Sequence, residues 1–458
     1  MRTANDCFRM AWPLRIAALA LSMAGLAAGA QANPSASLDI KAEMAHGTLV
    51  ADVAQKSYLR VAVTPARRDS AKRALMNVAL VIDRSGSMSA HGRMENARRA
   101  ATMAVDRLGR DDILSIVSYD DKAEVEVPAT KVLDPQAVKD KIQRLAPRGS
   151  TAIHTALLTA ANEVRKFKSR DRVNRIVLIS DGLANVGPSK PADFMSLGRE
   201  LASEGITVST IGLGNGYNED LMTGLARSAD GGHVFVAESA DLAGFLAREF
   251  DDAQGIVGQE VEIIIKTKAG VRPLRSLGRE AVIRDGVITY TIGTLIAGVE
   301  QVLLAEIEID AAAATGNGPV AEIGIAYNDA TSGERQTRTA SASVRFDGDR
   351  TQADASLNAA VMRDVATLVS RETRQEAIRL RDAGRADEAR AKFEANALYV
   401  REQKAKLPGS AAYAPLNDEL KANEAAASPA AQSSEGWLKA RKVQRATDSN
   451  QFGASQKY

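Results

Sequence analysis

The stretch VALVIDRSGSM, from Val78 to Met88, joins an apolar run to a cluster of polar side chains. Five of its first six residues are aliphatic or alanine, and the polar residues Asp83, Ser85 and Ser87 follow at once. A short apolar run bounded by turn residues is typical of a strand that is buried on both faces. The sequence therefore predicts that a central strand ends in one carboxylate and two hydroxyls.

The pattern around this stretch indicates an α/β domain over residues 75–250. Short apolar runs alternate there with helical stretches, and the runs are NVALVI, DILSIVSY, RIVLIS, ITVSTIGL and HVFV. Such alternation predicts a mostly parallel, doubly wound sheet with helices on both faces. The segment AEVEV, from Ala123 to Val127, follows one run closely and alternates, which favours an antiparallel edge strand.

The rest of the chain divides into further regions. Residues 255–348 contain strand patterns separated by turn signals, including the pair Asp285–Gly286, and predict a β-sandwich with a hairpin at that pair. Residues 33–74 hold an extended run, YLRVAVTP, that we expect to join this sandwich, with the α/β domain as an insertion. Residues 352–405 predict a helical hairpin that breaks at Gly384. Residues 406–458 are rich in Ala, Ser and Gln, and we expect a largely disordered tail with a short helix at GWLKARK.

The N-terminus has the pattern of a signal peptide. Arg2, Arg9 and Arg15 precede the apolar run from Ile16 to Ala30, and small-residue cleavage patterns follow. The run is shorter than the roughly 20 residues of a membrane-spanning helix. We therefore expect residues 1–32 to be cleaved and the mature protein to be periplasmic or secreted, without a membrane span. An uncleaved anchor is the alternative.

The overall charge argues against one class of partner. The chain of 458 residues has 59 Lys and Arg against 57 Asp and Glu, so bulk charge gives no indication of nucleic-acid binding. The single cysteine, Cys7, lies within the predicted signal peptide, so the mature protein would have no disulfide. The sequence does not predict an oligomeric state.

Two other loops offer side chains that match those after the first strand. Thr151 lies just before a helical stretch in RGSTAIHTAL, and Asp181 follows an apolar run in IVLISDGLAN. Ligands bind beyond the carboxyl ends of the strands in open α/β sheets, so these residues are expected to meet Asp83, Ser85 and Ser87. An all-oxygen set disfavours zinc and suits Mg²⁺, with Mn²⁺ or Ca²⁺ as alternatives.

This set of residues resembles the metal-ion-dependent adhesion site (MIDAS) of von Willebrand factor type A (VWA) domains. That pattern is Asp-x-Ser-x-Ser, then a distant Thr and a distant Asp, and the resemblance covers roughly residues 75–250. The stretches NRIVLISDGLANVGPS and STIGLGNGYNEDLM look like secreted bacterial members that are similar to inter-α-trypsin-inhibitor heavy chains and calcium-activated chloride-channel regulators. The resemblance implies a Rossmann-like domain.

The same resemblance implies a role for each residue. Ser85, Ser87 and Thr151 would give hydroxyl oxygens to the metal, while Asp83 and Asp181 would act directly or through water. The metal would then accept a carboxylate from an Asp or Glu of a protein partner. The sequence thus favours a metal-dependent, adhesion-type binding module rather than an enzyme.

Other interpretations of these residues remain open from the sequence. Asp83 and Thr151 are also placed as helix N-caps. Arg84 and His91 are candidates for the partner surface, or are simply solvated. A metal-assisted phosphoester or ester hydrolase is one alternative function, and a scaffold with a purely structural metal is another.

Overall fold

The computed structural model describes residues 38–67, 73–214, 216–236, 241–407, 414–428, 436–437 and 441. The predicted signal peptide, residues 1–32, lies outside them. Within these ranges, none of the helices has both the length and the apolar composition needed to cross a bilayer.

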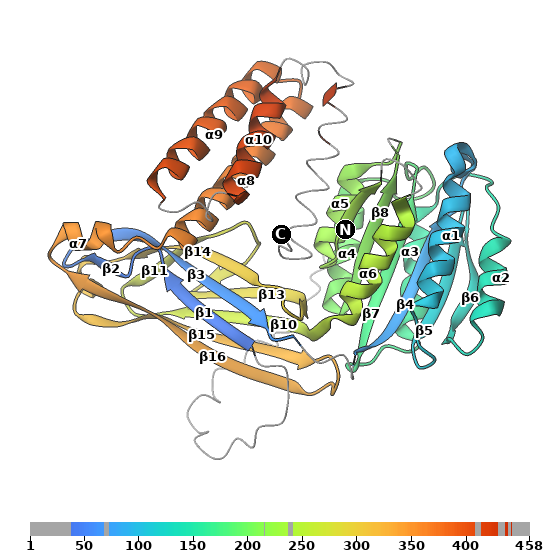
Figure 1. The fold of residues 1–458 in the computed structure, drawn as a ribbon, viewed down its shortest axis with the longest axis horizontal. Coiled ribbons are helices and arrows are strands. Elements are labelled where there is room, and N and C mark those ends of the chain that lie inside the picture. The colour runs from blue at the N-terminus through green and yellow to red at the C-terminus, as the bar shows by residue number, and fades with distance from the viewer. Residues whose placement is uncertain are drawn as a thin grey trace, which may run out of the picture. The chain divides into compact units, whose positions relative to one another are not determined.

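The predicted α/β fold is confirmed by a six-stranded sheet in the order β6-β5-β4-β7-β8-β9 (Figure 1). All neighbouring strands are parallel except β6, which is the expected antiparallel edge strand. The strands are β4 (Leu75–Asp83), β5 (Ile113–Tyr119), β6 (Ala123–Lys131), β7 (Arg172–Ser180), β8 (Ile206–Leu213) and β9 (His233–Val236). The helices are α1 (Arg93–Asp106), α2 (Pro135–Gln143), α3 (Ile153–Arg165), α4 (Pro191–Ser203), α5 (Glu219–Ser228) and α6 (Leu242–Gln254).

Strand β4 contributes to the cores on both faces of this sheet. Leu80 and Ile82 pack in a core with α1, α2 and α6, whereas Ala79 and Val81 pack in a second core with α3, α4 and α5. Side chains of a strand alternate between its faces, so a strand buried on both sides is mostly apolar. This explains the continuous apolar run that precedes Asp83. The exception near the start of β4 is Asn77, whose buried side chain donates to the Asn174 side chain at 3.0 Å.

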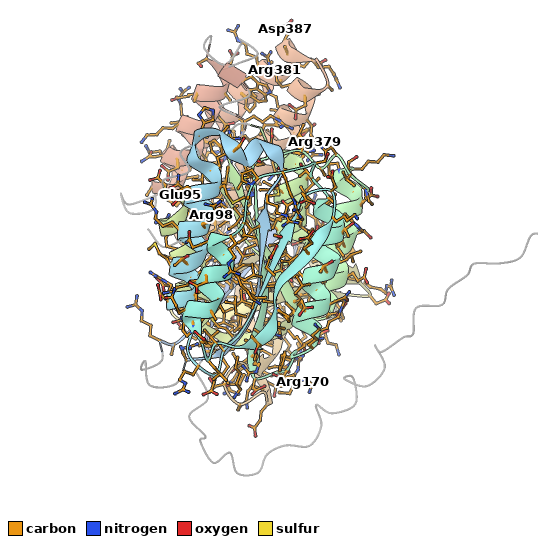
Figure 2. All side chains as sticks on the ribbon, turned by 90° about the vertical axis from the view of Figure 1, so that its right-hand side faces the viewer. Glu95, Arg98, Arg170, Arg379, Arg381 and Asp387 are labelled. Carbon is orange, nitrogen blue, oxygen red and sulfur yellow. The ribbon has the colours of Figure 1, made fainter. Side chains whose placement is uncertain are left out.

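Figure 2 helps to orient this domain. Glu95 and Arg98, one turn apart on α1, pair at 3.3 Å on the outside of the domain. Arg170 precedes β7 and lies at the opposite end of the view, so it marks the edge at which that strand begins. The carboxyl ends of the parallel strands, including Asp83, therefore lie at the other edge.

A β-sandwich flanks the α/β domain in sequence. One sheet has the order β1-β3-β14-β11 and the other β12-β13-β10-β15-β16-β2. Strand β3, before the α/β domain, pairs with β14, after it, as the insertion hypothesis requires. Asp285 and Gly286, with φ of 50° and 74°, form the two-residue turn between β12 and β13. The bounds are β1 (Leu38–Met44), β2 (Thr48–Val50), β3 (Gln55–Pro65), β10 (Ile256–Thr267), β11 (Val271–Leu277), β12 (Val282–Arg284), β13 (Val287–Ile296), β14 (Gln301–Ile309), β15 (Asn317–Asp329) and β16 (Arg335–Asp347).

The C-terminal region is helical. After the short α7 (Arg350–Ala355), α8 (Ala359–Asp382) and α9 (Ala386–Lys406) form a hairpin around Gly384, whose φ of 80° suits glycine. The expectation of a largely disordered tail is wrong for residues 414–427, which form α10 (Ala414–Ala427).

Buried contacts explain why α10 forms. Leu416 is buried in a core with residues of α8 and α9. Glu419 accepts a hydrogen bond from Arg371 at 2.8 Å, and Asn423 accepts one from Asn396 at 2.9 Å. Alanine, which suggested disorder by composition, is also the best helix former once a packing surface is available. Of the predicted helix at GWLKARK, only residues 436, 437 and 441 lie within the described ranges, and these are helical.

Candidate metal centre

Asp83 organises the first of the three loops at the carboxyl edge of the α/β sheet. The side chain is fully buried at the end of β4. One carboxylate oxygen accepts the backbone N–H of Ser85 at 2.8 Å, and the other accepts the hydroxyls of Ser180 at 2.7 Å and Tyr119 at 3.2 Å. Burial raises the pKa of Asp83, and the hydrogen bonds from Ser85 and Ser180 oppose that rise. Asp83 therefore fixes the path of the loop that carries the two serines.

The two serines connect Asp83's loop to Asp181. The hydroxyl oxygens of Ser85 and Ser87 lie 3.0 Å apart, and Ser87 donates to Asp181 Oδ1 at 2.7 Å. Ser85 and Asp181 are buried, whereas Ser87 is exposed. Three of the five residues selected from the sequence thus form a continuous chain of oxygens that reaches the surface.

Thr151 lies close to the same chain. A Cβ atom added at Gly182 would be 3.4 Å from Thr151 Oγ1 and 3.7 Å from Ser87 Oγ, so the two hydroxyls border one small space. The N-cap interpretation of Thr151 is wrong, because α3 begins at Ile153 and Ala152 occupies the N-cap. Among the described residues, the Thr151 hydroxyl has no hydrogen-bond partner, which leaves its lone pairs available to a ligand.

Backbone contacts hold the loops together. The N–H of Gly86 donates to the carbonyl of Gly149 at 3.0 Å. Asn185, which the sequence analysis did not select, accepts the Thr151 N–H on its side-chain oxygen at 2.7 Å and donates its own N–H to the Thr151 carbonyl at 3.2 Å. The only sequence signal for Asn185 is its position in the loop after Asp181. This position does not predict that Asn185 would bind the backbone of Thr151.

Arg84 requires a correction. It was a candidate for the partner surface or a solvated residue, but only 5% of it is exposed. Its Nη1 donates a hydrogen bond to Glu126 at 3.2 Å. Its Nε lies 3.0 Å from Asp120 and its Nη2 lies 2.7 Å from Glu124. These two contacts are ion pairs whose geometry is not that of a hydrogen bond. These carboxylates lie on β6 and the turn before it, so they draw the guanidinium inward, away from any partner.

His91 and Arg93 lie near the end of the first loop, with His91 exposed and Arg93 partly buried. His91 is exposed with a φ of 53°, near the end of the 3₁₀ segment Gly86–Gly92, and its role at a partner surface stays a prediction. Arg93 donates from Nη1 to Asp181 Oδ2 at 2.6 Å and was not selected from the sequence. A charged residue at the start of a helix gives no local sign that it will pair with a loop so far along the chain.

The donor set fits a hard cation. In the described ranges, no three His, Cys, Asp or Glu side chains are grouped so as to hold a metal, so neutral hydroxyls would supply much of the coordination. Hard cations such as Mg²⁺ and Ca²⁺ take oxygen ligands, and the five side chains here offer only oxygens. Ser85, Ser87 and Thr151 would hold the ion with Asp181, while Asp83 orients the serines.

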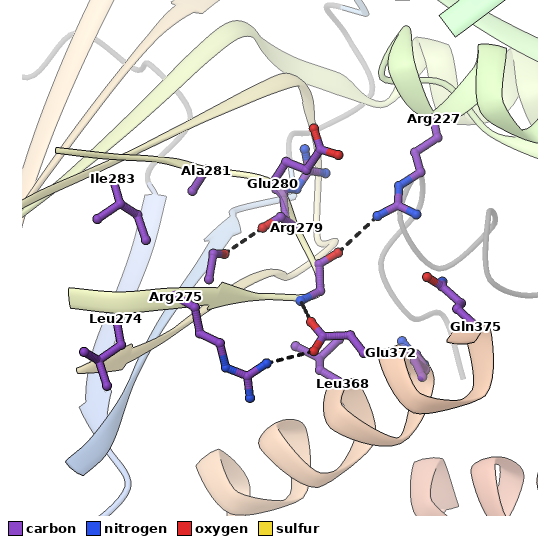
Figure 3. Close-up of a pocket in the computed structure, with 13 residues that line it drawn as sticks. Arg227, Leu274, Arg275, Arg279, Glu280, Ala281, Ile283, Leu368, Glu372 and Gln375 are labelled. Carbon is purple, nitrogen blue, oxygen red and sulfur yellow. Dashed lines mark hydrogen bonds and ion pairs between the residues drawn. The ribbon is translucent and has the colours of Figure 1, made fainter. Parts of the chain in front are cut away.

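The α/β domain also borders a cavity of about 560 Å³ elsewhere, which Figure 3 shows. Among its arginines, Arg275, Arg279 and Arg371 lie beside carboxylates, and Arg227 donates to the carbonyl of Gly278 at 3.5 Å. Glu372 accepts from Arg275 at 3.1 Å and from the N–H of Gly278 at 2.9 Å, and Arg371 donates to Glu419 at 2.8 Å. The protein's own groups thus already engage Arg275, Glu372 and Arg371.

Comparison with known proteins bears on the domain that carries these loops. Residues 77–248 match the family model described as von Willebrand factor type A domain. The uncharacterized protein sll0103 of Synechocystis is 28% identical over 286 residues, which cover 60% of this chain and 67% of that protein. Inter-alpha-trypsin inhibitor heavy chain H3 of Bos taurus is 28% identical over 198 residues, 41% of this chain and 22% of that protein. Calcium-activated chloride channel regulator 1 of Bos taurus is 26% identical over 163 residues, 35% of this chain and 17% of that protein.

A solved structure extends the similarity beyond the α/β domain. The von Willebrand factor type A protein from Catenulispora acidiphila has a TM-score of 0.72 and 17% identity, over 93% of this chain and 99% of that one. At this identity the match concerns the fold alone. The predicted resemblances to the family, to the heavy chains and to the channel regulator are confirmed, although the chain spans only about a fifth of the two Bos taurus proteins.

Proposed function

Because residues 77–248 of this chain form a von Willebrand factor type A domain, we propose that the protein is an exported module that binds another protein through a divalent cation. VWA domains are commonly metal-dependent protein-interaction modules, and most of their relatives are not enzymes. The proposals of export and of a periplasmic or secreted location rest on the sequence pattern of residues 1–32.

The observation that carries the proposal is the group of hydroxyls around Gly182. Ser87 and Thr151 border one space there, and Ser85 lies 3.0 Å from Ser87. Neutral hydroxyls do not cancel the charge of a cation, so the bound ion would keep a strong attraction for a further anionic ligand. Ser87 is exposed, which gives an Asp or Glu of a partner protein access to that ion.

The oxygen-only donor set supports Mg²⁺ as the natural ion. An octahedron with Mg–O distances of 2.0–2.1 Å has neighbouring oxygens about 2.9 Å apart. The Ser85–Ser87 and Ser87–Asp181 oxygen distances are 3.0 Å and 2.7 Å. Hydrogen bonds hold oxygens at these same distances, so the spacing permits an octahedral ion without selecting it. Mn²⁺ could substitute for Mg²⁺, whereas the longer bonds of Ca²⁺ would require the loops to spread.

The first test is metal binding by the full chain after treatment with EDTA. Calorimetric titration with MgCl₂ should show one site in the wild type and none in the double variant Ser85→Ala, Ser87→Ala. Ser203→Ala is the matched control, because Ser203 is an exposed serine at the end of α4, just before β8 begins at the other edge of the sheet. Equal binding by all three proteins would place the metal elsewhere and refute the site.

The second test separates binding from the other functions. Immobilised protein should retain a partner from an envelope extract in Mg²⁺ but not in EDTA, and the double variant should not retain it. If Mg²⁺ raises the unfolding temperature without changing what is captured, the metal is structural. If the wild type cleaves a generic phosphoester and Asp83→Asn does not, the protein is a hydrolase.

A further inference from the structure

Arg93 is the charged residue of the site that neither the sequence pattern nor the family match explains. It is the first residue of α1, and its Nη1 lies 2.6 Å from Asp181 Oδ2. The Asp181 side chain is fully buried and the Arg93 side chain is 17% exposed. The pair is therefore a short, largely buried, charge-assisted contact at the side chain that would serve the metal.

The position of Arg93 is unfavourable for the helix that carries it. The N-terminus of a helix has a partial positive charge, which repels a cation in the first turn. The contact with Asp181 offsets that repulsion, so the stabilising partner of Arg93 is the site rather than the helix. The residue before it, Gly92, is left-handed with a φ of 65°, and no side chain caps this end.

The opposite side of the guanidinium fits against a glycine. A Cβ atom at Gly214, where φ is 63°, would lie 2.8 Å from Arg93 Nη2. A side chain at that position would therefore push the guanidinium away. The absence of a side chain at Gly214 thus leaves room for the Arg93 guanidinium. The guanidinium lies between Gly214 on one side and Asp181 on the other.

Both carboxylate oxygens of Asp181 already accept a hydrogen bond. Oδ1 accepts from Ser87 and Oδ2 accepts from Arg93. A metal that binds Asp181, directly or through water, must share this carboxylate with the guanidinium or displace it. Of the two negative charges of Asp83 and Asp181, one is already balanced by Arg93.

We propose that Arg93 is a tethered cation that competes with the divalent metal for Asp181 and so weakens metal binding. This inference rests on the proposed function, because it assumes the metal site. It predicts a metal affinity that is low for a site with this number of ligands, so that metal occupancy follows the concentration of the free cation around the protein. Competition between like charges at contact distance is expected to cost tenfold or more in affinity.

The test is titration of the EDTA-treated full chain with MgCl₂. Arg93→Gln should bind Mg²⁺ at least tenfold more tightly than the wild type, and Arg93→Lys, which keeps the charge, should stay within about threefold of the wild type. Arg99→Gln is the control, because it removes the same charge from an exposed position on the same helix. It should bind like the wild type.

Thermal unfolding gives a second readout that does not depend on a partner. In EDTA, Arg93→Gln should unfold at a lower temperature than the wild type, because Asp181 loses its counter-ion, and Mg²⁺ should raise its unfolding temperature more than that of the wild type. Equal or weaker Mg²⁺ binding by Arg93→Gln would overturn the inference and leave the metal site intact. Absence of Mg²⁺ binding in every variant would overturn both the inference and the proposed function.

Discussion

Replacement of Arg84 by glutamine should destabilise the α/β domain strongly, even without metal. The guanidinium is 7% exposed and faces three carboxylates, at 3.0 Å from Asp120, 2.7 Å from Glu124 and 3.2 Å from Glu126. Asp120 is as deeply buried as Arg84, whereas Glu124 is 47% exposed and contributes little. Removing one partner of a buried ion pair costs about 3–5 kcal/mol, because a charge stays behind unpaired.

The lower end of that range applies here. Arg148 also donates to Asp120, at 2.7 Å, and would still compensate its charge in the variant. A loss of about 3 kcal/mol in the free energy of unfolding corresponds to a fall of roughly 6–12 °C in the unfolding temperature of a domain of this size. Arg84 directly precedes Ser85, so loss of its side-chain contacts should loosen the loop that carries Ser85, although the backbone bond from the Arg148 N–H to the Arg84 carbonyl is kept.

Thermal and urea unfolding of the full chain in EDTA would measure this loss without a contribution from metal. The exposed Arg99→Gln variant should unfold within about 0.5 kcal/mol of the wild type. A loss below about 1 kcal/mol for Arg84→Gln would show that water screens the cluster, and would refute the argument that Arg84 is a buried structural residue.

Three other changes test separate parts of the structure. Asn185→Ala should cost about 1 kcal/mol, because Thr151 loses the acceptor of its N–H, and should weaken Mg²⁺ binding several-fold in the calorimeter. Gly231→Ala should cost about 3 kcal/mol or more in urea unfolding, because its Cβ would lie 2.1 Å from a backbone oxygen of β8. The hydrogen bond from Arg165 lowers the pKa of Glu204, so this pair stabilises the fold above the ordinary pKa of 4.5 and loses its effect as the pH falls below it. The free energy of unfolding of Glu204→Gln should therefore fall less between pH 7 and pH 3 than that of the wild type, by about 0.5–1 kcal/mol because both partners are partly exposed.

Each of these predictions has a matched comparison. Asn185→Asp keeps an acceptor oxygen, so equal losses in the Ala and Asp variants would contradict the role given to that oxygen. Gly244 lies within α6, where an added Cβ meets no atom within 4 Å, and Gly244→Ala should stabilise the protein by about 0.5–1 kcal/mol. Identical acid profiles for Glu204→Gln and the wild type would show that this pair does not contribute.

The α/β fold could be predicted because its evidence is local. Burial of β4 and β7 on both faces favours continuous apolar runs, which appear as VALVI at 78–82 and IVLI at 176–179, each within a single strand. The hairpin at Asp285–Gly286 was predictable for a similar reason, since both positions need a left-handed backbone. The helix α10 was missed because its stability depends on contacts with α8 and α9 rather than on its own composition.

The positions of the candidate ligands were predictable from topology. Parallel strands place their carboxyl ends at one edge, so Asp83 and Asp181 had to approach each other once both were assigned to strand ends. Their neighbours were not predictable, because the partners are distant in sequence. Asn185 is 34 residues from Thr151, and Arg93 is 88 residues from Asp181.

Arg84 and Arg93 show how the same side chain can have opposite effects at one site. Arg84 pairs with carboxylates that are not candidate ligands, so its charge holds the loops in place without entering the ligand set. Arg93 pairs with Asp181 itself, so its charge opposes the metal. Loss of Arg84 should therefore lower stability in EDTA and weaken metal binding, whereas loss of Arg93 should lower stability in EDTA but strengthen metal binding. Only the sign of the change in Mg²⁺ affinity separates the two roles. The affinity, rather than the stability, therefore decides whether an arginine holds the loops in place, as proposed for Arg84, or competes with the metal, as proposed for Arg93.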